Sequence, residues 1–309
     1  MENNYFLPIL GSSVDTFLEA TSYPCEGDFT HAKYLGNSAG GCPFNVGAVV
    51  ASKGVKVKAI DMLGKDDDTT PFLLNEMKRL NMDSEFVEIR ENVVNGKVFI
   101  VNTGDNRTMF VVDPVRPPYD MNQNIQDLLD NATYIYSLMH MINRSFSTIE
   151  PLLEAKKKGA KVVLDGSSKY DDPSRVKILY SLADGMFINE NDFERLKENS
   201  DGDPRDIIFA NGGEFICLTK GSKGATLYLK DREIYEPAMK GVKVLDSTGA
   251  GDSFAGGFIS GIMMGYGYEK ALRLATANGA YACTNFGGLG GVSSIDTLID
   301  FAKEHDYEI

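Results

Sequence analysis

The feature that most constrains the fold of this chain is a repeated alternation of short apolar runs with longer stretches of helical character. Strand-like runs such as YIYSL (134–138), KVVLDGS (161–167) and FICLTKG (215–221) are separated by helix-like segments. Short apolar runs bounded by turn residues are typical of strands buried on both faces, and strands that alternate with helices form parallel sheets. We therefore predict an α/β fold, with a doubly wound, mostly parallel sheet flanked by helices.

Two stretches, 16–37 and 87–113, break this rhythm because neither contains a convincing helix. The second alternates as hairpin strands do, with turn residues at NG (95–96) and GDN (104–106). We expect both stretches to form a small β-sheet lid. The α/β domain would then comprise residues 1–15, 38–86 and 114–309. Its other expected elements are strands at 6–11, 55–64 and 186–190 and helices at 42–54, 67–81, 145–158, 173–183, 191–198 and 251–265.

Composition excludes several classes of function. The net charge of −13 and the absence of a basic stripe argue against nucleic acid as a partner. No apolar stretch of about 18 residues is present, so we expect no membrane span. The four cysteines form no CxxC pair and the three histidines are scattered, which argues against a zinc cluster. Together with the absence of a basic N-terminal leader, this pattern predicts a cytoplasmic protein.

The stretch VLDSTGAGDSF places three small residues and a carboxylate at the start of a helix. Neither the Walker pattern nor the dinucleotide fingerprint is present. The free N–H groups of a helix start and its dipole would face one point, which Gly249, Ala250 and Gly251 leave open to an anion. Asp252 could then act as a general base toward a hydroxyl that attacks phosphorus. A capped, glycine-rich helix start without a ligand would give the same pattern.

Other polar residues stand where strands end or helices begin. GSSVD ends a strand on Asp15, and SAGGCPFNVG puts Gly40 and Gly41 before a helix with Asn45 in its first turn. An acid after a central strand, or an Asn beside glycines, could bind sugar hydroxyls. A loop-to-helix turn with a capping Asn is the alternative.

Two further strand ends carry polar residues. FINENDFE places Asn189 and acids after a strand, where hydrated magnesium could bind. An exposed acidic helix start is the alternative for this run. The run TKGSKG follows another strand, and it could present to polyphosphate or ribose the residues Thr219, Gly221, Ser222 and Gly224. A surface turn is the alternative there.

In order and spacing, these motifs resemble those of the ribokinase-like, or PfkB, family of carbohydrate and nucleoside kinases over nearly the whole chain. VLDSTGAGDSF resembles the second family signature and SAGGCPFNVG the first. The resemblance implies a ribokinase-like α/β domain with a β-sheet lid. It also implies ATP-dependent transfer of the γ-phosphoryl group to a hydroxyl, usually primary, of a free monosaccharide such as a ketohexose or ribose. The lid would be able to pair two subunits into a homodimer.

The resemblance assigns roles by position. Asp252 matches the catalytic base, and Gly249, Ala250 and Gly251 match the anion hole. The positions that bind sugar hydroxyls are matched by Asp15, Gly40, Gly41 and Asn45. The nucleotide positions are matched by Thr219, Gly221, Ser222 and Gly224, with Asn278 beside the adenine.

The resemblance also implies cations. Asn189 and Asp192 match the NxxE motif for magnesium and phosphate, with Asp in place of Glu. Asp246 and the loop 285–292 resemble the monovalent-cation site that many members use for K⁺. We therefore expect ATP, Mg²⁺ and a site for K⁺.

The identity of the acceptor remains open at this stage. Lys169 is the one basic residue in GSSKY, where many sugar kinases carry Asn and Arg. In the lid, Lys97 and Arg107 would bind the phosphate of a sugar-phosphate substrate or be exposed charges. In a nucleoside kinase, stacking surface would come from the aromatic residues Tyr23, Phe29 and Phe110. A non-catalytic sugar- or nucleotide-binding regulator is the alternative from another class, against which the intact Asp252 argues.

Overall fold

The computed structural model describes residues 4–104, 106–113, 116–166, 173–199 and 203–309. Its larger sheet consists of β1 (Phe6–Pro8), β4 (Val57–Gly64), β5 (Met82–Arg90), β8 (Tyr134–Leu138), β9 (Lys161–Asp165), β10 (Gly185–Asn189), β11 (Phe215–Thr219), β12 (Ala225–Tyr228) and β13 (Glu233–Glu236). The strand order is β13-β12-β11-β10-β9-β8-β1-β4-β5. All neighbouring strands run parallel except β12 and β13, which add an antiparallel edge. The prediction of a doubly wound, mostly parallel sheet is confirmed.

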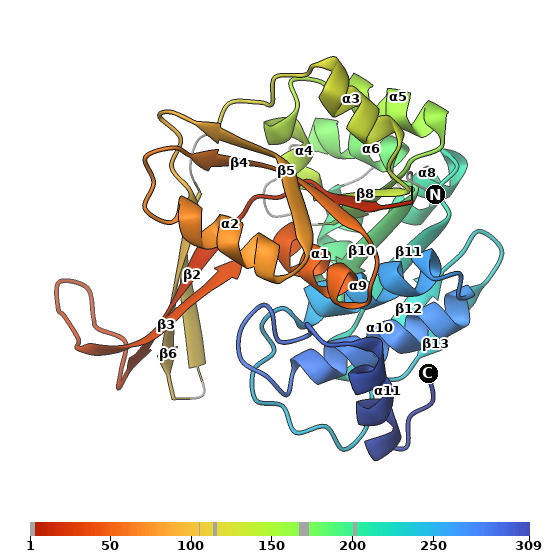
Figure 1. The fold of residues 1–309 in the computed structure, drawn as a ribbon. Coiled ribbons are helices and arrows are strands. Elements are labelled where there is room, and N and C mark those ends of the chain that lie inside the picture. The colour runs from red at the N-terminus through yellow and green to blue at the C-terminus, as the bar shows by residue number, and fades with distance from the viewer. Residues whose placement is uncertain (1–3, 105, 114–115, 167–172, 200–202) are drawn as a thin grey trace.

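Helices cover both faces of this sheet (Figure 1). One face packs against α1 (Cys42–Ser52), α2 (Thr70–Arg79), α9 (Ala250–Met263) and α10 (Tyr268–Ala282). The other face packs against α3 (Gln123–Asp130), α4 (Met139–Ser145), α5 (Glu150–Lys158), α6 (Pro173–Leu182), α7 (Glu190–Asn199) and α8 (Pro204–Ala210). The last helix, α11 (Ile295–Glu304), packs outside α10.

Successive residues of each strand belong to opposite halves of the core, because side chains alternate across a strand. In β9, Val162 and Leu164 pack on the α3–α8 side, whereas Val163 packs on the α9 side. Burial on both faces explains why these strands are continuous apolar runs in the sequence. Among the described helices, none is both long and apolar enough to cross a lipid bilayer.

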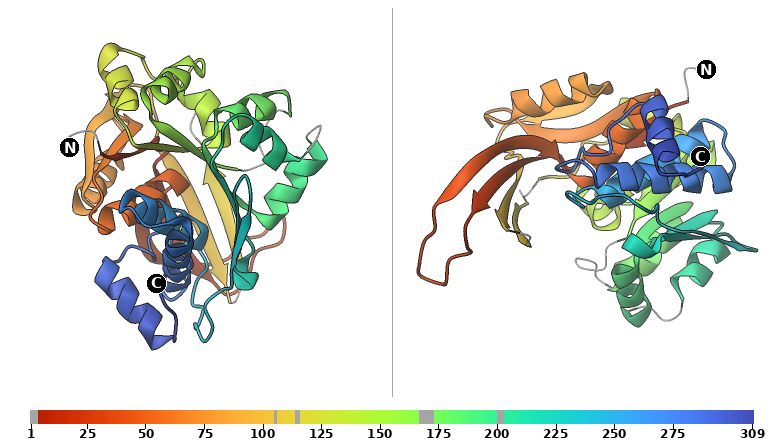
Figure 2. Two further views of the ribbon diagram at one scale, coloured as in Figure 1. Left: turned by 90° about the vertical axis from the view of Figure 1, so that its right-hand side faces the viewer. Right: turned by 90° about the horizontal axis from the view of Figure 1, so that it is seen from below.

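A second, four-stranded sheet projects from one side of this body (Figures 1 and 2). Its strands are β2 (Ser13–Ala20), β3 (Ala32–Gly40), β6 (Gly96–Thr103) and β7 (Asn106–Val112), in the order β3-β2-β6-β7. The two central strands, β2 and β6, run parallel, and the outer pairs are antiparallel. We refer to this sheet as the lid sheet.

The limits of the lid sheet differ from the predicted lid segments 16–37 and 87–113. Residues 13–15 and 38–40 belong to β2 and β3 in the lid sheet. Residues 87–90 end β5 and pair with β4 in the large sheet. Alternation of polar and apolar residues predicts a strand, but it does not tell which of two sheets the strand joins.

The predicted hairpin turn at NG (95–96) is wrong, because β5 and β6 lie in different sheets. Asn95 is instead fully buried between them. Its side-chain oxygen accepts a hydrogen bond from the Gly64 N–H, and its amide donates to the Thr70 hydroxyl. Gly96 is the first residue of β6. The Asn therefore fixes the crossover from the body to the lid sheet.

Candidate active site

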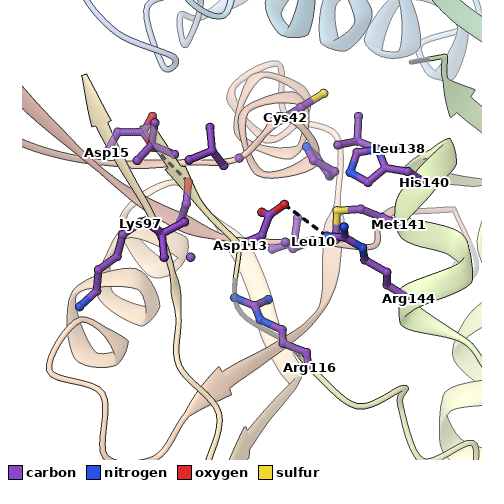
Figure 3. A pocket seen from close by; sticks show the side chains of 18 of the residues that line it. Leu10, Asp15, Cys42, Lys97, Asp113, Arg116, Leu138, His140, Met141 and Arg144 are labelled. Carbon is purple, nitrogen blue, oxygen red and sulfur yellow. Dashed lines mark hydrogen bonds and ion pairs between the residues drawn. The ribbon is translucent and has the colours of Figure 1, made fainter. Parts of the chain in front are cut away.

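A cavity of about 670 Å³ lies between the lid sheet and the ends of the central strands (Figure 3). Leu10, Met62 and Leu138, from the segments of β1, β4 and β8, line its body side, and β6 and β7 line its lid side. In the sheet, β4 and β5 lie on one side of β1, whereas β8 and the later strands of the chain lie on its other side, so the strand order reverses between β1 and β8. Ligands of open α/β sheets bind at such a reversal of strand order.

The first turn of α9 faces this cavity. Gly249, which precedes the helix, has a φ of 71°, and a Cβ there would collide with the carbonyl of Gly288. Only glycine satisfies both conditions. Gly251 is exposed, and a Cβ on it would meet nothing within 4 Å. The Ala250 N–H donates to Ser247, so the first-turn N–H groups available to an anion are those of Gly251 and Asp252.

Asp252 lines the cavity from the first turn of α9. Its carboxylate accepts a hydrogen bond of 2.8 Å from Nδ2 of Asn45 on α1. Burial raises the pKa of Asp252, and hydrogen bonds from Asn45 and Cys42 oppose this shift. The helix dipole favours the ionised form, whereas burial acts in the opposite direction and makes the carboxylate a stronger proton acceptor.

Asn45 is buried beside Asp252. Its Nδ2 is used by Asp252, while its Oδ1 is buried and has no hydrogen-bond partner among the described residues. A Cβ on Gly288 would lie 2.6 Å from Nδ2 of Asn45, so the glycine-rich loop packs directly against this side chain. A buried acceptor without a donor suits a ligand hydroxyl.

Asp15 approaches the cavity from β2, with Ser13 Oγ donating to its carboxylate at 3.0 Å. Gly40 lies against this carboxylate, since a Cβ there would collide with Asp15. Gly41 has a φ of 102°, and a Cβ on it would lie 2.7 Å from the Gly11 carbonyl oxygen. The two glycines therefore allow β3 and α1 to approach the carboxylate and the end of β1.

The protonation of Asp15 predicts a pH dependence. The family resemblance implies that Asp15 binds hydroxyls of the substrate. Burial raises the pKa of Asp15 to about 6; Ser13 opposes this shift, and the charge of Asp252 adds to it. Below that pH the carboxyl group is protonated and can accept fewer hydrogen bonds, so the KM for the phosphoryl acceptor should rise about tenfold per pH unit. In Asp15→Asn this rise near pH 6 should disappear, with the KM for ATP as internal control. An Asn variant that keeps the same pH dependence of acceptor KM would contradict this role.

The predicted nucleotide residues meet at the ends of β10 and β11. Asn189 and Thr219 are directly paired in the sheet. The turn after Thr219 is open at Gly221 and exposed at Ser222, whereas a Cβ on Gly224 would collide with the Glu236 carbonyl. The structure therefore brings these residues together at the carboxyl edge of the parallel sheet.

A group of acidic residues lies between this edge and α9. Asn189 Nδ2 donates to Asp192 at 2.6 Å, and Asp192 also forms an ion pair with Arg195. Asp165, which ends β9, accepts a hydrogen bond of 2.9 Å from the Tyr136 hydroxyl. Burial and the charges of Asp252 and Asp192 raise the pKa of Asp165 to about 7. Our sequence analysis missed Asp165, although an acid at a strand end is the same signal that selected Asp15.

These carboxylates fit a magnesium ion that arrives with a nucleotide. Their charges disfavour one another, and a cation would relieve that repulsion. Within the described residues, no three His, Cys, Asp or Glu side chains form a preformed metal cluster. Mg²⁺ commonly uses only one or two carboxylates together with phosphates and water. Asp165 is the side chain that would hold it, because Tyr136 occupies only one of its oxygens, whereas both oxygens of Asp192 already accept from Asn189 and Arg195, so Asp192 would act through water.

Two other predicted residues, Arg107 and Asn278, do not line the cavity. Arg107 is not among the described residues that line the cavity, and it forms an ion pair of 3.1 Å with Asp246. Asn278 is fully buried in α10 and donates to the Gly291 carbonyl at 3.1 Å, so it holds the glycine-rich loop. Its place beside an adenine stays a prediction. Lys169 lies outside the described residues.

The side of the cavity opposite Asp15 and Lys97 carries two arginines and a histidine that the sequence analysis missed (Figure 3). His140 and Arg144 come from α4, and Arg116 comes from the segment after the lid sheet. Arg144 forms an exposed ion pair of 3.3 Å with Asp113. No motif marked these residues, because their position depends on how two segments distant in the sequence converge on the cavity.

Two sets of lid residues bear on the alternatives for the acceptor. Lys97 lines the cavity, but its charge also contributes to lowering the pKa of Asp67. Tyr23 and Phe110 stack on each other with ring centroids 6.3 Å apart, and both are largely exposed. Neither aromatic residue is among the described residues that line the cavity.

A doubly wound domain, a lid sheet and a carboxylate at an open helix start define a small-molecule kinase, an ATP-dependent phosphotransferase. Comparison with known families agrees with this class. Residues 5–294 match the pfkB family carbohydrate kinase, and the chain belongs to this family. It is a sugar or nucleoside kinase of the ribokinase family.

Individual relatives differ in their acceptors. The chain is 25% identical over 281 residues to an ATP-dependent 6-phosphofructokinase of Thermoanaerobacterium thermosaccharolyticum, covering 87% of this chain and 85% of that protein. It is 32% identical to a nucleoside kinase of Methanocaldococcus jannaschii, but over 120 residues, 39% of each chain. The structure of Arabidopsis thaliana ribokinase, solved with ribose and ATP, superimposes with a TM-score of 0.82 at 21% identity, covering 97% of this chain and 98% of that one.

Proposed function

We propose that this protein transfers the γ-phosphoryl group of ATP to a hydroxyl, in particular a primary hydroxyl, of a free monosaccharide. The observation that carries the proposal is the position of Asp252. Its carboxylate lines the cavity beside the exposed Gly251, and a buried Asn45 orients it. A proton acceptor and an anion-binding helix start at one point are what transfer of a phosphoryl group to an alcohol requires.

In this mechanism Asp252 orients the acceptor hydroxyl and takes its proton as the oxygen attacks phosphorus. The N–H groups of Gly251 and Asp252, with the α9 dipole, stabilise charge on the transferring group. Bound Mg²⁺ supplies neutralisation of the phosphate charge. Asp165, and Asp192 through water, would hold this ion near the nucleotide. The lid sheet excludes water, which would otherwise compete as acceptor.

The polar end of the cavity supports a sugar as acceptor. Asp15 lines the cavity and can accept hydrogen bonds from hydroxyls. The ribose bound by the Arabidopsis ribokinase supports the same class of acceptor.

A nucleoside is the second candidate. Apart from Asp15, Asp252 and the charged side chains such as Lys97, Arg116 and Arg144, the cavity is lined largely by apolar side chains, which suit a flat heterocycle better than a ring covered with hydroxyls. The nucleoside kinase among the relatives supports this candidate. The apolar lining includes Leu10, Met62, Val98, Ile100, Met109, Val111, Leu138 and Met141.

Pairing of two subunits through the lid remains a proposal. β7 is an edge strand of the lid sheet, and Phe110 on it is 53% exposed. Unpaired edge strands with exposed apolar side chains are suited to pairing with a second copy.

An acceptor panel tests the proposed function. Ketoses, aldoses, sugar acids, phosphosugars and nucleosides are each supplied with ATP and Mg²⁺, and the ADP formed per acceptor is measured against ATP hydrolysis without acceptor. We expect a free monosaccharide to give the highest kcat/KM. Preference for a nucleoside would establish the second candidate. The absence of acceptor-dependent ADP formation across the whole panel would overturn the proposal.

A further inference from the structure

The carboxylate of Asp246, three residues before Gly249, is surrounded by hydrogen-bond donors. Its Oδ1 accepts from the Thr248 N–H at 2.9 Å, from the Thr248 hydroxyl at 2.6 Å and from Nη1 of Arg107 at 3.1 Å. Its Oδ2 accepts from the Gly287 N–H at 2.9 Å. Arg107 also donates to the Thr248 hydroxyl. Both carboxylate oxygens are therefore engaged, and one of the donors is charged.

This cluster joins three parts of the site. Arg107 belongs to the lid strand β7, Asp246 and Thr248 lead into α9, and Gly287 belongs to the glycine-rich loop. The next residue of that loop, Gly288, packs against both Gly249 and Asn45. The charge at Asp246 therefore sits behind the helix start that is proposed to bind the phosphoryl group.

The residues present do not fit the monovalent cation that the family resemblance implies at Asp246. A K⁺ ion needs oxygen lone pairs directed at it, whereas donors from three segments already occupy this carboxylate. A guanidinium in contact with the same oxygen would also repel the ion. Both partners are partly shielded, with side-chain exposures of 32% for Arg107 and 15% for Asp246, so their attraction is screened less than at an open surface.

Asp246 stays ionised in this arrangement. Burial acts to raise its pKa, but hydrogen bonds from Thr248 and Gly287 together with the charge of Arg107 outweigh burial, and the net shift is downward. An ionised carboxylate behind an anion site would weaken that site unless a cation neutralises it. Arg107 is the cation that contacts it.

We propose that Arg107 is the resident cation of this site: its guanidinium replaces the monovalent ion at Asp246, so phosphoryl transfer by this protein does not require K⁺. This inference rests on the proposed kinase function. Because Arg107 lies on β7, the lid sheet supplies the charge that neutralises Asp246.

The test compares the natural protein with Arg107→Met, Arg107→Lys and Lys33→Met, a variant of an exposed lid cation on β3. Turnover is measured in tetramethylammonium, Na⁺ and K⁺ at equal ionic strength. The natural protein and Lys33→Met should turn over equally in all three within about twofold. Arg107→Met should lose about ten- to a hundredfold without K⁺, the value of a lost charge-assisted hydrogen bond, and K⁺ should restore part of it. Arg107→Lys should keep most activity without K⁺.

Thermal unfolding in the same salts gives a readout independent of turnover. K⁺ should raise the Tm of Arg107→Met above its value in tetramethylammonium, but not that of the natural protein. Strong activation or specific stabilisation of the natural protein by K⁺ would overturn the inference. So would an Arg107→Met variant with unchanged turnover, or one whose loss neither K⁺ nor Lys repairs. If no acceptor is phosphorylated, the kinase proposal fails, while the unfolding data still decide whether Asp246 binds K⁺.

Discussion

Replacing Asp252 with Asn should lower kcat by about 10²–10⁴-fold, the usual contribution of a positioned general base. The change keeps the shape of the side chain and its ability to accept the hydrogen bond from Asn45, but removes the proton acceptor. The KM or Kd for ATP should change little, because Asp252 acts on the acceptor hydroxyl. Steady-state kinetics with the preferred acceptor and a separate nucleotide-binding measurement would check both expectations.

The matched control is Asp296→Asn. Asp296 is also a carboxylate in the first turn of a helix, α11, but it is exposed and is not among the residues that line the cavity. The control should retain full activity. Asp252→Asn should not unfold the protein, since burial already raises the pKa of this carboxyl group and Asn removes the buried charge. Near-normal turnover of folded Asp252→Asn would end its assignment as the base.

The sequence was most informative where one local pattern decided the outcome. The apolar runs predicted the large parallel sheet because its strands are buried on both faces. The small residues before Asp252 predicted an open helix start, and the structure has space at Gly251. Asp15 lines the cavity and Asn45 contacts Asp252, which also lines it, because the strand and the helix that carry them meet at the reversal of strand order.

Predictions failed, or could not be made, where distant segments converge. The NG dipeptide has hairpin chemistry, yet Asn95 is buried in a crossover between two sheets. Arg107 was expected to bind substrate, and it contacts Asp246, 139 residues further along the chain. Local spacing cannot show that a lid cation and a loop carboxylate meet. The same holds for Arg116, whose buried partner lies 55 residues earlier.

Arg116 supports the second large prediction, because Arg116→Met should lower the free energy of unfolding by about 3–5 kcal/mol at neutral pH. Its partner Asp61 is fully buried in β4, with Nη1 of Arg116 3.1 Å from its carboxylate. The Met62 N–H also donates to Asp61, and Arg116 donates to the Ser12 carbonyl. Removing the guanidinium leaves a buried carboxylate without its cation, which chemical denaturation followed by circular dichroism would detect.

The control for this change is Arg144→Met on the same side of the cavity. The ion pair of Arg144 with Asp113 is exposed, at 52% and 57% for the two side chains, and should be worth about 0–1 kcal/mol. A loss in Arg116→Met no larger than in Arg144→Met would show that the buried pair does not stabilise the fold.

The pH dependence of Arg116→Met separates the lost charge pair from lost packing. Burial raises the pKa of Asp61 and Arg116 opposes the shift, so removing Arg116 should raise that pKa further. The folded variant would then bind a proton more tightly than its unfolded chain. Its deficit relative to the natural protein should therefore shrink as the pH falls through the raised folded-state pKa of Asp61. The double variant Asp61→Asn/Arg116→Met should recover much of the loss at neutral pH, whereas a pH-independent deficit would assign the effect to packing around the Arg116 side chain.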